Sequence, residues 1–249
     1  MEQFNPFSLT GKTILVTGAS SGIGQSIAVT ISKMGAIVVV NGRNEARLQK
    51  TMSMLAGEGH SMLIADLTKQ SDVDALATNV VPLDGIVHCA GVGHRMPAKM
   101  VTEADVNSVM DANFKGAVLL QAALLMKKKV KKDSSIVFIA SKAADYPSVG
   151  NAIYSASKGA LISYSKCLAL ELAPRGIRVN CICPAMVWTD LILQNEVTVD
   201  QLRESEKNYP LKRYGRPEDI ANLAVYLLSD ASSWMTNSCI DITGGGNSL

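Results

Sequence analysis

The chain has 249 residues, of which 47% are hydrophobic and 18% charged, and its formal net charge is +2. This composition excludes a disordered protein, and the small net charge gives no reason to expect nucleic-acid binding. The opening residues, MEQFNPFSLTGK, lack the basic and then apolar pattern of a signal peptide. No apolar run reaches the roughly 18 residues of a membrane span. We therefore expect a cytoplasmic protein that acts away from membranes.

The cysteines are odd in number and stand mostly in apolar surroundings, which indicates reduced, buried thiols; they are Cys89, Cys167, Cys181, Cys183 and Cys239. Cys181 and Cys183 would share one face of a strand. No second pair of cysteines and no histidine cluster accompanies them, so we expect no metal site.

A strand, a glycine turn and a helix open the chain. Residues 12–17 (KTILVT) are apolar and β-branched, and residues 25–34 have helical spacing. Glycines let a phosphate approach the backbone, and the free N–H groups of a helix N-terminus favour an anion. Because the turn lies between a strand and a helix, we interpret it as a dinucleotide site rather than a purely structural turn. Its candidate cofactor-binding residues are Gly18, Ser20, Ser21, Gly22, Ile23 and Gly24.

The residues after the second strand, 36–41 (AIVVVN), decide the cofactor. A carboxylate there would bind the adenosine ribose hydroxyls of NAD, but this chain has Gly42 and Arg43. A guanidinium at this point can pair with a 2′-phosphate, so we predict NADP(H) in preference to NAD(H). The alternative is that Arg43 is a solvated loop charge.

The third strand carries a further candidate contact. It follows a charged helix over 45–55 and ends at Asp66, before Leu67 and a short helix over 71–79. Asp66 can hydrogen-bond the adenine, and the alternative is a helix N-cap role for Asp66 or Thr68.

The fourth strand, 83–88, runs into a turn of small residues that contains Ala90 and Gly91. A long amphipathic helix follows over 103–126, with Asn113 as a polar residue inside its apolar stripe. A buried asparagine needs hydrogen-bond partners, so we expect Asn113 to bend the helix or to hold a water molecule.

A serine, a tyrosine and a lysine follow the fifth strand, 134–140. Tyr154 and Lys158 are four residues apart, about one helical turn, so they project from the same side of a helix. The ammonium group favours the phenolate form of the tyrosine, which suits proton transfer near neutral pH. Ser141 stands at the strand end, within reach of a helix that returns alongside. The alternative for this short pattern is a core aromatic beside a solvated lysine, but the nucleotide turn and Asn113 favour a catalytic role for Tyr154 and Lys158.

The last part of the chain completes the alternation of strands and helices. A strand over 176–183 ends at a proline, and the irregular, polar segment 185–210 is a candidate substrate lid. A helix over 216–228 and a strand over 239–243 follow. No linker or repeat divides the chain. We predict one domain over 1–249, an α/β fold with a doubly wound parallel sheet of about seven strands, of Rossmann type with three layers.

From Lys12 to Gly246 the chain resembles a short-chain dehydrogenase/reductase. The motifs that carry the resemblance occur in the family's order; they are Thr17-Gly18-x-x-x-Gly22-x-Gly24, Asp66, Ala90-Gly91, Asn113, Ser141, Tyr154-x-x-x-Lys158, Asn180 with Pro184, Thr189, and Arg216 with Glu218. So many motifs in one order make the resemblance specific.

The resemblance implies roles for these residues. Tyr154 is the general acid in reduction, Ser141 hydrogen-bonds the substrate oxygen, Lys158 holds the nicotinamide ribose, and Asn113 supports a water in a proton relay. The glycine turn holds the pyrophosphate. The other cofactor contacts implied are Asp66, Leu67, Ala90, Gly91, Pro184, Val187 and Thr189.

The sequence departs from the family pattern in three places. His88 and Cys89 stand where two asparagines are common, and Ala185 replaces a glycine after Pro184. Asn237 replaces a glycine before the last strand, and asparagine tolerates positive φ better than most residues.

Within the family the chain looks most like the 3-oxoacyl-acyl-carrier-protein reductases. This implies NADPH-dependent reduction of a 3-oxoacyl thioester, acyl-carrier protein as a partner, and a homotetramer, with a dimer next. Basic residues beside the active-site entrance dock the carrier in those enzymes, and Lys128, Lys129 and Arg175 are the comparable residues here. The alternative for the basic run 127–132 is a cationic helix end and a solvated loop.

Other functions are compatible with the same motifs. The substrate can be another ketone or alcohol, such as a sugar, a steroid or a small ketone. A non-catalytic NADP-binding sensor or scaffold would typically lose the tyrosine or the lysine, and this chain keeps both Tyr154 and Lys158. Extended relatives that act as epimerases or dehydratases are longer chains with a separate substrate domain.

Overall fold

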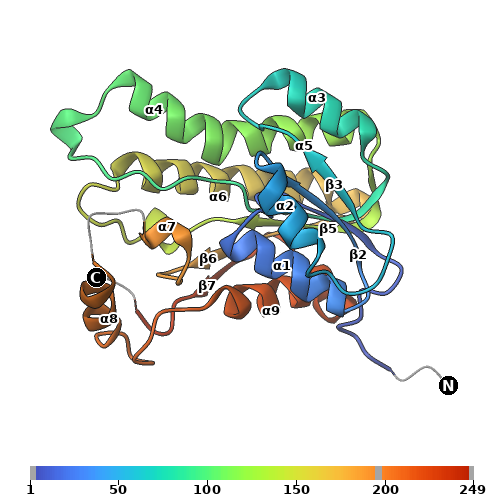
Figure 1. Cartoon of the computed structure of the whole chain (residues 1–249). Coiled ribbons are helices and arrows are strands. Elements are labelled where there is room, and N and C mark those ends of the chain that lie inside the picture. The colour runs from blue at the N-terminus through green and yellow to red at the C-terminus, as the bar shows by residue number, and fades with distance from the viewer. Residues whose placement is uncertain (1–3, 194–197, 247–249) are drawn as a thin grey trace.

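The computed structural model describes residues 4–193 and 198–246. Within them the chain forms one parallel sheet of seven strands in the order β3-β2-β1-β4-β5-β6-β7 (Figure 1). The strands are β1 (Thr13–Val16), β2 (Ile37–Gly42), β3 (Ser61–Ile64), β4 (Leu83–His88), β5 (Val130–Ile139), β6 (Arg178–Pro184) and β7 (Cys239–Ile242). This sheet confirms the predicted doubly wound α/β fold.

Helices cover both faces of the sheet. On one face α1 packs against α9, and on the other α3 packs against α5 while α4 packs against α6. The helices are α1 (Gly22–Lys33), α2 (Glu45–Met52), α3 (Gln70–Asn79), α4 (Glu103–Met110), α5 (Gly116–Met126), α6 (Ala152–Leu172), α7 (Asp190–Leu193), α8 (Val199–Glu206) and α9 (Pro217–Leu228). In Figure 1 the segment with α7 and α8 lies at one end of the sheet.

The two cores lie on opposite sides of the sheet. Successive side chains of a strand point to opposite faces, so Leu15 joins the core beneath α3, α5 and α6, whereas Ile14 and Val16 join the core beneath α1 and α9. Because both faces are covered, the inner strands are continuous apolar runs, such as residues 136–139 of β5.

The order of the strands reverses between β1 and β4. The chain winds from β1 outward to β2 and β3, then returns to β4 on the other side of β1 and continues to β7. In open parallel sheets, ligands bind in the crevice outside the carboxyl ends of the strands at such a reversal. This topology directs the search for a site to the residues that follow β1 and β4.

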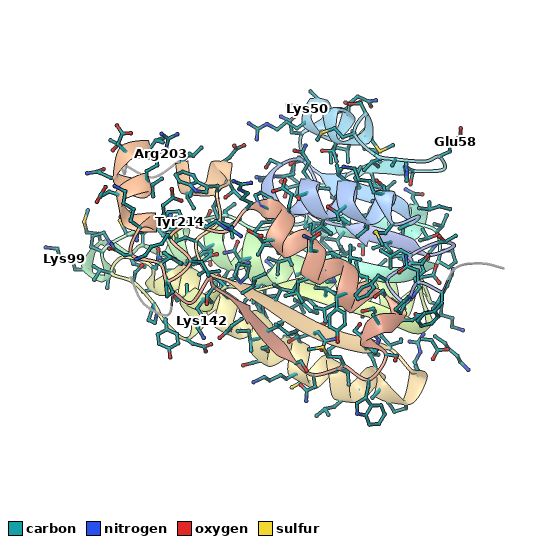
Figure 2. The ribbon with its side chains drawn as sticks, turned by 90° about the horizontal axis from the view of Figure 1, so that it is seen from below. Lys50, Glu58, Lys99, Lys142, Arg203 and Tyr214 are labelled. Atoms are coloured by element: carbon teal, nitrogen blue, oxygen red, sulfur yellow. The ribbon has the colours of Figure 1, made fainter. Side chains whose placement is uncertain are left out.

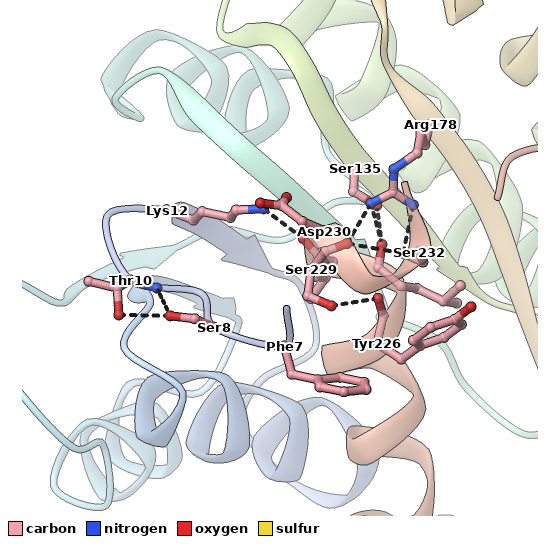
Figure 3. Close-up of polar contacts among 12 residues, drawn as sticks. Phe7, Ser8, Thr10, Lys12, Ser135, Arg178, Tyr226, Ser229, Asp230 and Ser232 are labelled. Atoms are coloured by element: carbon pink, nitrogen blue, oxygen red, sulfur yellow. Dashed lines mark hydrogen bonds and ion pairs between the residues drawn. The ribbon is translucent and has the colours of Figure 1, made fainter. Parts of the chain in front are cut away.

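Arg178 fastens the start of β6 to the end of α9 (Figure 3). Its Nη2 donates to the carbonyl oxygens of Leu227 at 2.8 Å and Ser229 at 3.2 Å, and its Nη1 donates to Ser232 Oγ at 2.9 Å. The last carbonyls of a helix have no partner within the helix, so a planar cation is well suited to bind them. This end of the sheet is therefore held by a structural arginine, far along the strands from the reversal crevice.

Several element boundaries differ from the sequence-based predictions. The first helix begins at Gly22 rather than at residue 25, since the Gln25 N–H already donates to the Ser21 carbonyl at 3.2 Å. Strand β5 begins at Val130, because its polar start pairs with β4 through Val130 and Leu83. The segment 185–210 contains α7 and α8, and its residues 194–197 lie outside the described part of the chain.

Two compositional predictions are corrected. The helix Glu103–Met126 is long and apolar enough, by length and composition, to cross a membrane, although the sequence led us to expect no such run. Its buried residues, among them Leu120 and Leu124, belong to the core of this fold. Cys181 and Cys183 are buried on one face as predicted, but Cys167 and Cys239 are exposed.

Candidate active site

A cavity of about 870 Å³ opens at the carboxyl ends of the strands. Every residue predicted to bind the cofactor lines it, and so do three of the four predicted catalytic residues, Ser141, Tyr154 and Lys158. Asn113 alone of the predicted set does not line it. The cofactor set along the wall comprises Gly18, Ser20, Ser21, Gly22, Ile23, Gly24, Arg43, Asp66, Leu67, Ala90, Gly91, Tyr154, Lys158, Pro184, Val187 and Thr189.

The loops after β1 and β4 meet at the point of strand reversal. The Thr17 hydroxyl oxygen accepts hydrogen bonds from the backbone N–H groups of Cys89 at 3.0 Å and Ala90 at 3.2 Å. These two bonds hold the turn after β4, although His88 and Cys89 stand where two asparagines are common in the family. A Cβ on Gly18 would lie 2.8 Å from the Ala90 backbone, which means that only glycine allows this approach.

The glycine turn is a cradle that side chains would fill. Gly18 and Gly22 have φ values of +66° and +55°, which glycine adopts without strain. A Cβ on Gly24 would lie 2.3 Å from the Gly18 carbonyl oxygen, and one on Gly22 would lie 3.2 Å from Thr189. The bare backbone and the start of α1 together form the surface that a dinucleotide pyrophosphate needs, so the residues fit an NAD(P) cofactor.

Arg43 and Asp66 face each other at the adenosine end of the cavity. Arg43 Nη1 is 3.9 Å from Asp66 Oδ2, and the Arg43 side chain is 64% exposed. Burial tends to raise the pKa of Asp66, but hydrogen bonds from Thr68 and the nearby charges of Arg43 and Lys69 outweigh it, so this pKa lies below its usual value. Lys69 is the N-cap residue of α3, so the N-cap alternative for Asp66 or Thr68 is wrong.

Ser141, Tyr154 and Lys158 come together from β5 and α6. Ser141 follows β5 and begins a short turn, in which its Oγ accepts a hydrogen bond from the Ala143 N–H at 3.1 Å. Lys158 is buried, and its Nζ donates to the Ile139 carbonyl at 2.9 Å and lies 5.8 Å from the centre of the Tyr154 ring. The strand end and the first turns of the helix thus place a hydroxyl, a phenol and an ammonium group on one wall.

Asn113 lies in a π-helical turn between α4 and α5. Its Oδ1 accepts from the Val92 N–H at 2.7 Å, and its Nδ2 donates to the Val92 carbonyl at 3.0 Å and to Ser157 Oγ at 3.1 Å. Single π turns often mark functional sites. The prediction of a distorted helix is confirmed, and the side chain binds the loop after β4, which carries Gly91 toward Lys158.

Two basic side chains that line the cavity, Lys142 and Arg95, were not predicted from the sequence. Lys142, directly after Ser141, lines the cavity and forms ion pairs with Asp241 of β7 and with Asp145 at 3.6 Å. A hydrogen bond from its ammonium group to Asp241 raises the pKa of Lys142 despite burial. Arg95 lines the same region, and its Nη2 donates to Ser148 Oγ at 3.3 Å. The signal for Lys142 was its position beside Ser141, but its partner is 99 residues away.

The basic residues assigned to carrier docking lie at the other edge of the sheet. Lys129 immediately precedes β5 and donates to the Val80 carbonyl, and Arg175 precedes β6 and donates to the Val130 carbonyl. Ser141 follows the opposite end of β5, a strand of 10 residues. At about 3.3 Å per residue this separates the two edges by roughly 30 Å. The expectation that these cations flank the entrance is therefore wrong within one chain.

Asn237 has the backbone conformation that its family glycine would have. Its φ is +59°, as the sequence-based argument predicted. Its N–H donates to the Val179 carbonyl at 2.8 Å, which leads the chain into β7 beside β6. The substitution of asparagine for glycine is thus accommodated at the place where the sheet ends.

The chain resembles known oxidoreductases over nearly its whole length. A family model described as enoyl-(acyl carrier protein) reductase matches residues 18–247. The 3-oxoacyl-(acyl-carrier-protein) reductase FabG of Rickettsia felis is 34% identical over 242 residues, 95% of this chain and 97% of that protein. The L-xylulose reductase of Caenorhabditis elegans is 32% identical over 244 residues, 96% of this chain and 97% of that protein.

A solved structure of another oxidoreductase is also similar to this chain over nearly its whole length. It is described as an NAD(P)-dependent gluconate 5-dehydrogenase from Beutenbergia cavernae with bound NADP, and it matches with a TM-score of 0.86 and 30% identity over 97% of this chain and 98% of its own. Both the sequence and the three-dimensional matches thus extend from the glycine turn to the last strand. This protein therefore belongs to the short-chain dehydrogenase/reductase family of NAD(P)-binding oxidoreductases.

Proposed function

We propose that this protein is an NADPH-dependent reductase that transfers a hydride to a carbonyl group. The observation that carries the proposal is that Ser141, Tyr154 and Lys158 line one cavity together with the glycine turn. A hydroxyl, a phenol and an ammonium group beside a dinucleotide site are the groups that carbonyl reduction requires. Bound NADPH would supply the hydride.

The roles of the side chains follow from their hydrogen bonds. Ser141 Oγ accepts from the Ala143 N–H, which leaves its own hydrogen free to hold the substrate oxygen. The Tyr154 phenol would give a proton to that oxygen as negative charge develops on it. Lys158 uses one N–H on the Ile139 carbonyl and keeps two for Tyr154 and the cofactor ribose. Asn113 would act as a positioning residue through Val92.

The preference for NADP(H) rests on Arg43. Its side chain is exposed at the adenosine end and its contact with Asp66 is long, so the guanidinium is free to turn toward a 2′-phosphate. The carboxylate of Asp66, which lines the same cavity, would bind the adenine. NADP bound to the gluconate 5-dehydrogenase relative supports this cofactor.

The first candidate substrate is a 3-oxoacyl thioester on acyl-carrier protein, in fatty acid biosynthesis. The support is the similarity to the Rickettsia felis reductase, which extends over 95% of this chain and 97% of that protein. Segment 185–210 would act as the substrate lid; in its described part Met186, Ile192 and Leu202 line the cavity. Any carrier protein would have to meet this entrance through residues other than Lys129 and Arg175 of the same chain.

A second candidate is a small polar ketone or its alcohol. The observation in its favour is a set of polar side chains that line the cavity, namely Lys142, Ser148, Asn151 and Asn208. An acyl chain would gain little from such a wall, whereas the hydroxyl groups of a sugar-like substrate would find partners. Similarity to L-xylulose reductase and to gluconate 5-dehydrogenase agrees with this candidate.

A substrate panel tests the proposal. NADPH oxidation is followed by absorbance with a 3-oxoacyl thioester, ketose sugars and small diketones, and NADPH binding is measured in parallel. We expect turnover of at least one of these carbonyl compounds, and the ratio of kcat/KM values separates the two candidates. Tight NADPH binding with no turnover of any ketone in the panel would favour a non-catalytic sensor and contradict the proposal.

We also propose that the whole chain acts as one domain in a cytoplasmic homotetramer. Large apolar side chains are exposed on the helical face and near β7, including Leu170, Trp234 and Met126. Exposed apolar surface of this kind favours burial between copies. Sedimentation velocity measures the assembly, and a monomer at micromolar concentration would contradict it.

A further inference from the structure

The charges that line the cavity are unbalanced. Among the described residues, five lysine and arginine side chains line it but only two carboxylates, Asp66 and Asp190. The whole chain, by contrast, is close to neutral at +2. Positive charge is thus concentrated in this cavity, and its position along the cavity indicates what it binds.

Four of the five cations are accounted for by neighbours or by the cofactor. Arg43 lies 3.9 Å from Asp66, and Arg47 lies 3.7 Å from Asp190. Lys158 donates to a backbone carbonyl beside Tyr154, where the cofactor ribose is expected. The remaining pair, Lys142 and Arg95, belongs to the substrate end, and the charge of Lys142 is balanced by Asp241 and Asp145 (Figure 2 labels Lys142).

Arg95 is the cation left over at the substrate end. In the described part of the chain no carboxylate lies within 4 Å of its guanidinium group. Its Nη2 donates to Ser148 Oγ at 3.3 Å, and Asn151 Nδ2 donates to the same oxygen at 2.9 Å. Ser148 therefore accepts twice and keeps its own hydrogen for a further acceptor.

The three side chains point to one kind of ligand. Arg95 has further N–H groups, Ser148 has a free O–H, and Asn151 has a second N–H, so the cluster offers mainly donors. A group of donors that includes a guanidinium matches an oxyanion, either a carboxylate or a phosphate. All three residues line the cavity.

The cluster stands close to the reacting centre. Asn151 directly precedes α6, and Tyr154 follows it by three residues, less than one helical turn. The loops that carry Arg95 and Ser148 are joined by a backbone hydrogen bond from Met96 N–H to the Gly150 carbonyl at 2.8 Å. The donors are therefore held near Tyr154, within reach of a group a few bonds from a substrate carbonyl.

We propose that Arg95, Ser148 and Asn151 form an oxyanion-binding subsite that selects substrates bearing a carboxylate or a phosphate. The subsite rests on the proposed carbonyl reduction, and it narrows the substrate class. In a short oxo acid the anion is the carboxylate, which lies a few bonds from the carbonyl. In a carrier-bound thioester it would be the phosphate of the pantetheine arm, which is separated from the carbonyl by the whole arm, so the position of the cluster beside Tyr154 favours the carboxylate. In both cases Arg95 sets specificity rather than the chemical step.

Binding of the reduced product to the NADPH-loaded enzyme tests the subsite without turnover. NADPH and a hydroxy compound are both reduced, so they form a dead-end complex whose Kd is measured by calorimetry. The probes are 3-hydroxybutyrate with its neutral amide, and gluconate with neutral glucitol. We expect one anion at least to bind ten times more tightly than its neutral counterpart. Equal affinity within both pairs would overturn the subsite.

Variants of Arg95 test whether this residue causes the preference for the anionic probe. Arg95→Gln should remove the preference for the anion and leave the neutral probe within threefold, and Arg95→Lys should retain part of it because a charge remains. Lys50 of α2, labelled in Figure 2, is an exposed cation that does not line the cavity, so Lys50→Gln is the charge-matched control and should keep the preference. An Arg95→Gln enzyme with an unchanged preference would overturn the assignment.

A thioester pair distinguishes the two sources of the anion. 3-Hydroxybutyryl-phosphopantetheine is compared with the same thioester of pantetheine, which lacks the phosphate. A preference in this pair that Arg95→Gln removes assigns the phosphate, and a preference confined to the free acids assigns the carboxylate. Loss of NADPH-dependent turnover for every ketone would contradict the proposed reduction but would leave these binding results readable.

Discussion

Arg43 is the residue on which cofactor choice depends. The sequence predicted its role from the absence of a carboxylate after β2, and the structure places it on the cavity wall beside Asp66 at 3.9 Å. Because the side chain is exposed, its own contribution to the stability of the fold is small. Its effect should therefore appear almost entirely in cofactor binding.

Arg43→Ala is expected to lower kcat/KM for NADPH by roughly 10- to 100-fold, the loss of a charge-assisted hydrogen bond. Activity with NADH should stay within threefold, since NADH has no 2′-phosphate. Steady-state kinetics with both cofactors measures the ratio. A wild-type enzyme that used NADH better than NADPH would contradict the assignment, as would an equal loss for both cofactors in the variant.

At the scale of elements, the turn between β1 and α1 and the first half of α6 carry the site. Two glycines on these elements differ in the space available for a side chain. A Cβ on Gly24 would lie 2.3 Å from the Gly18 carbonyl oxygen, whereas a Cβ on Gly159 of α6 would meet nothing within 4 Å. The first glycine is required by close packing, and the second lowers the stability of a helix interior.

Gly24→Ala should therefore weaken NADPH binding at least 100-fold, because the turn must open to admit the methyl group. Gly159→Ala should leave binding unchanged and raise the free energy of unfolding by about 0.5–1 kcal/mol. Fluorescence titration with NADPH and urea unfolding measure the two effects. Normal NADPH affinity in the Gly24→Ala protein would show that the turn does not hold the cofactor.

The sequence predicted these elements because their signals are local. The glycine turn spans seven residues, and Tyr154 and Lys158 stand one helical turn apart, so spacing alone brings them together. Contacts between distant residues were not predictable in this way. Arg95 meets Ser148 across 53 positions and Lys142 meets Asp241 across 99, and no periodicity encodes either pair. The misplaced docking role of Lys129 and Arg175 has a different cause. Both residues precede strands, and in a parallel sheet the amino ends of the strands lie at the edge opposite the cavity.

At the scale of the whole molecule, His88 makes the stability of the fold depend on acidic pH. This histidine is the last residue of strand β4, which leads into the site. It is buried, stacks on Phe138 with ring centres 4.6 Å apart, and its Nε2 lies 3.0 Å from Gln121 Oε1. Burial lowers the pKa of His88 to about 4, although the bond to Gln121 opposes the shift. The unfolded chain, with an ordinary histidine pKa near 6.5, therefore binds the proton more readily.

Stability should accordingly be lost as the pH falls from about 6.5 to 4, by roughly 3 kcal/mol at most. His88→Gln keeps a hydrogen-bonding side chain but removes the titration, so its stability should depend less steeply on pH in this window. Urea unfolding at a series of pH values measures both proteins. Identical slopes in the two proteins between pH 6.5 and 4 would show that His88 does not titrate on unfolding.

The central claim is that Tyr154 gives the proton in an NADPH-dependent reduction. The most direct test is to measure NADPH binding and NADPH oxidation side by side in the wild-type and Tyr154→Phe proteins, with the best substrate of the panel. Loss of one phenolic oxygen should leave the Kd for NADPH within about threefold and lower kcat by roughly 10²- to 10⁴-fold, the range of general acid catalysis. A Tyr154→Phe enzyme that retained more than about a tenth of wild-type kcat would fall outside that range and contradict the account.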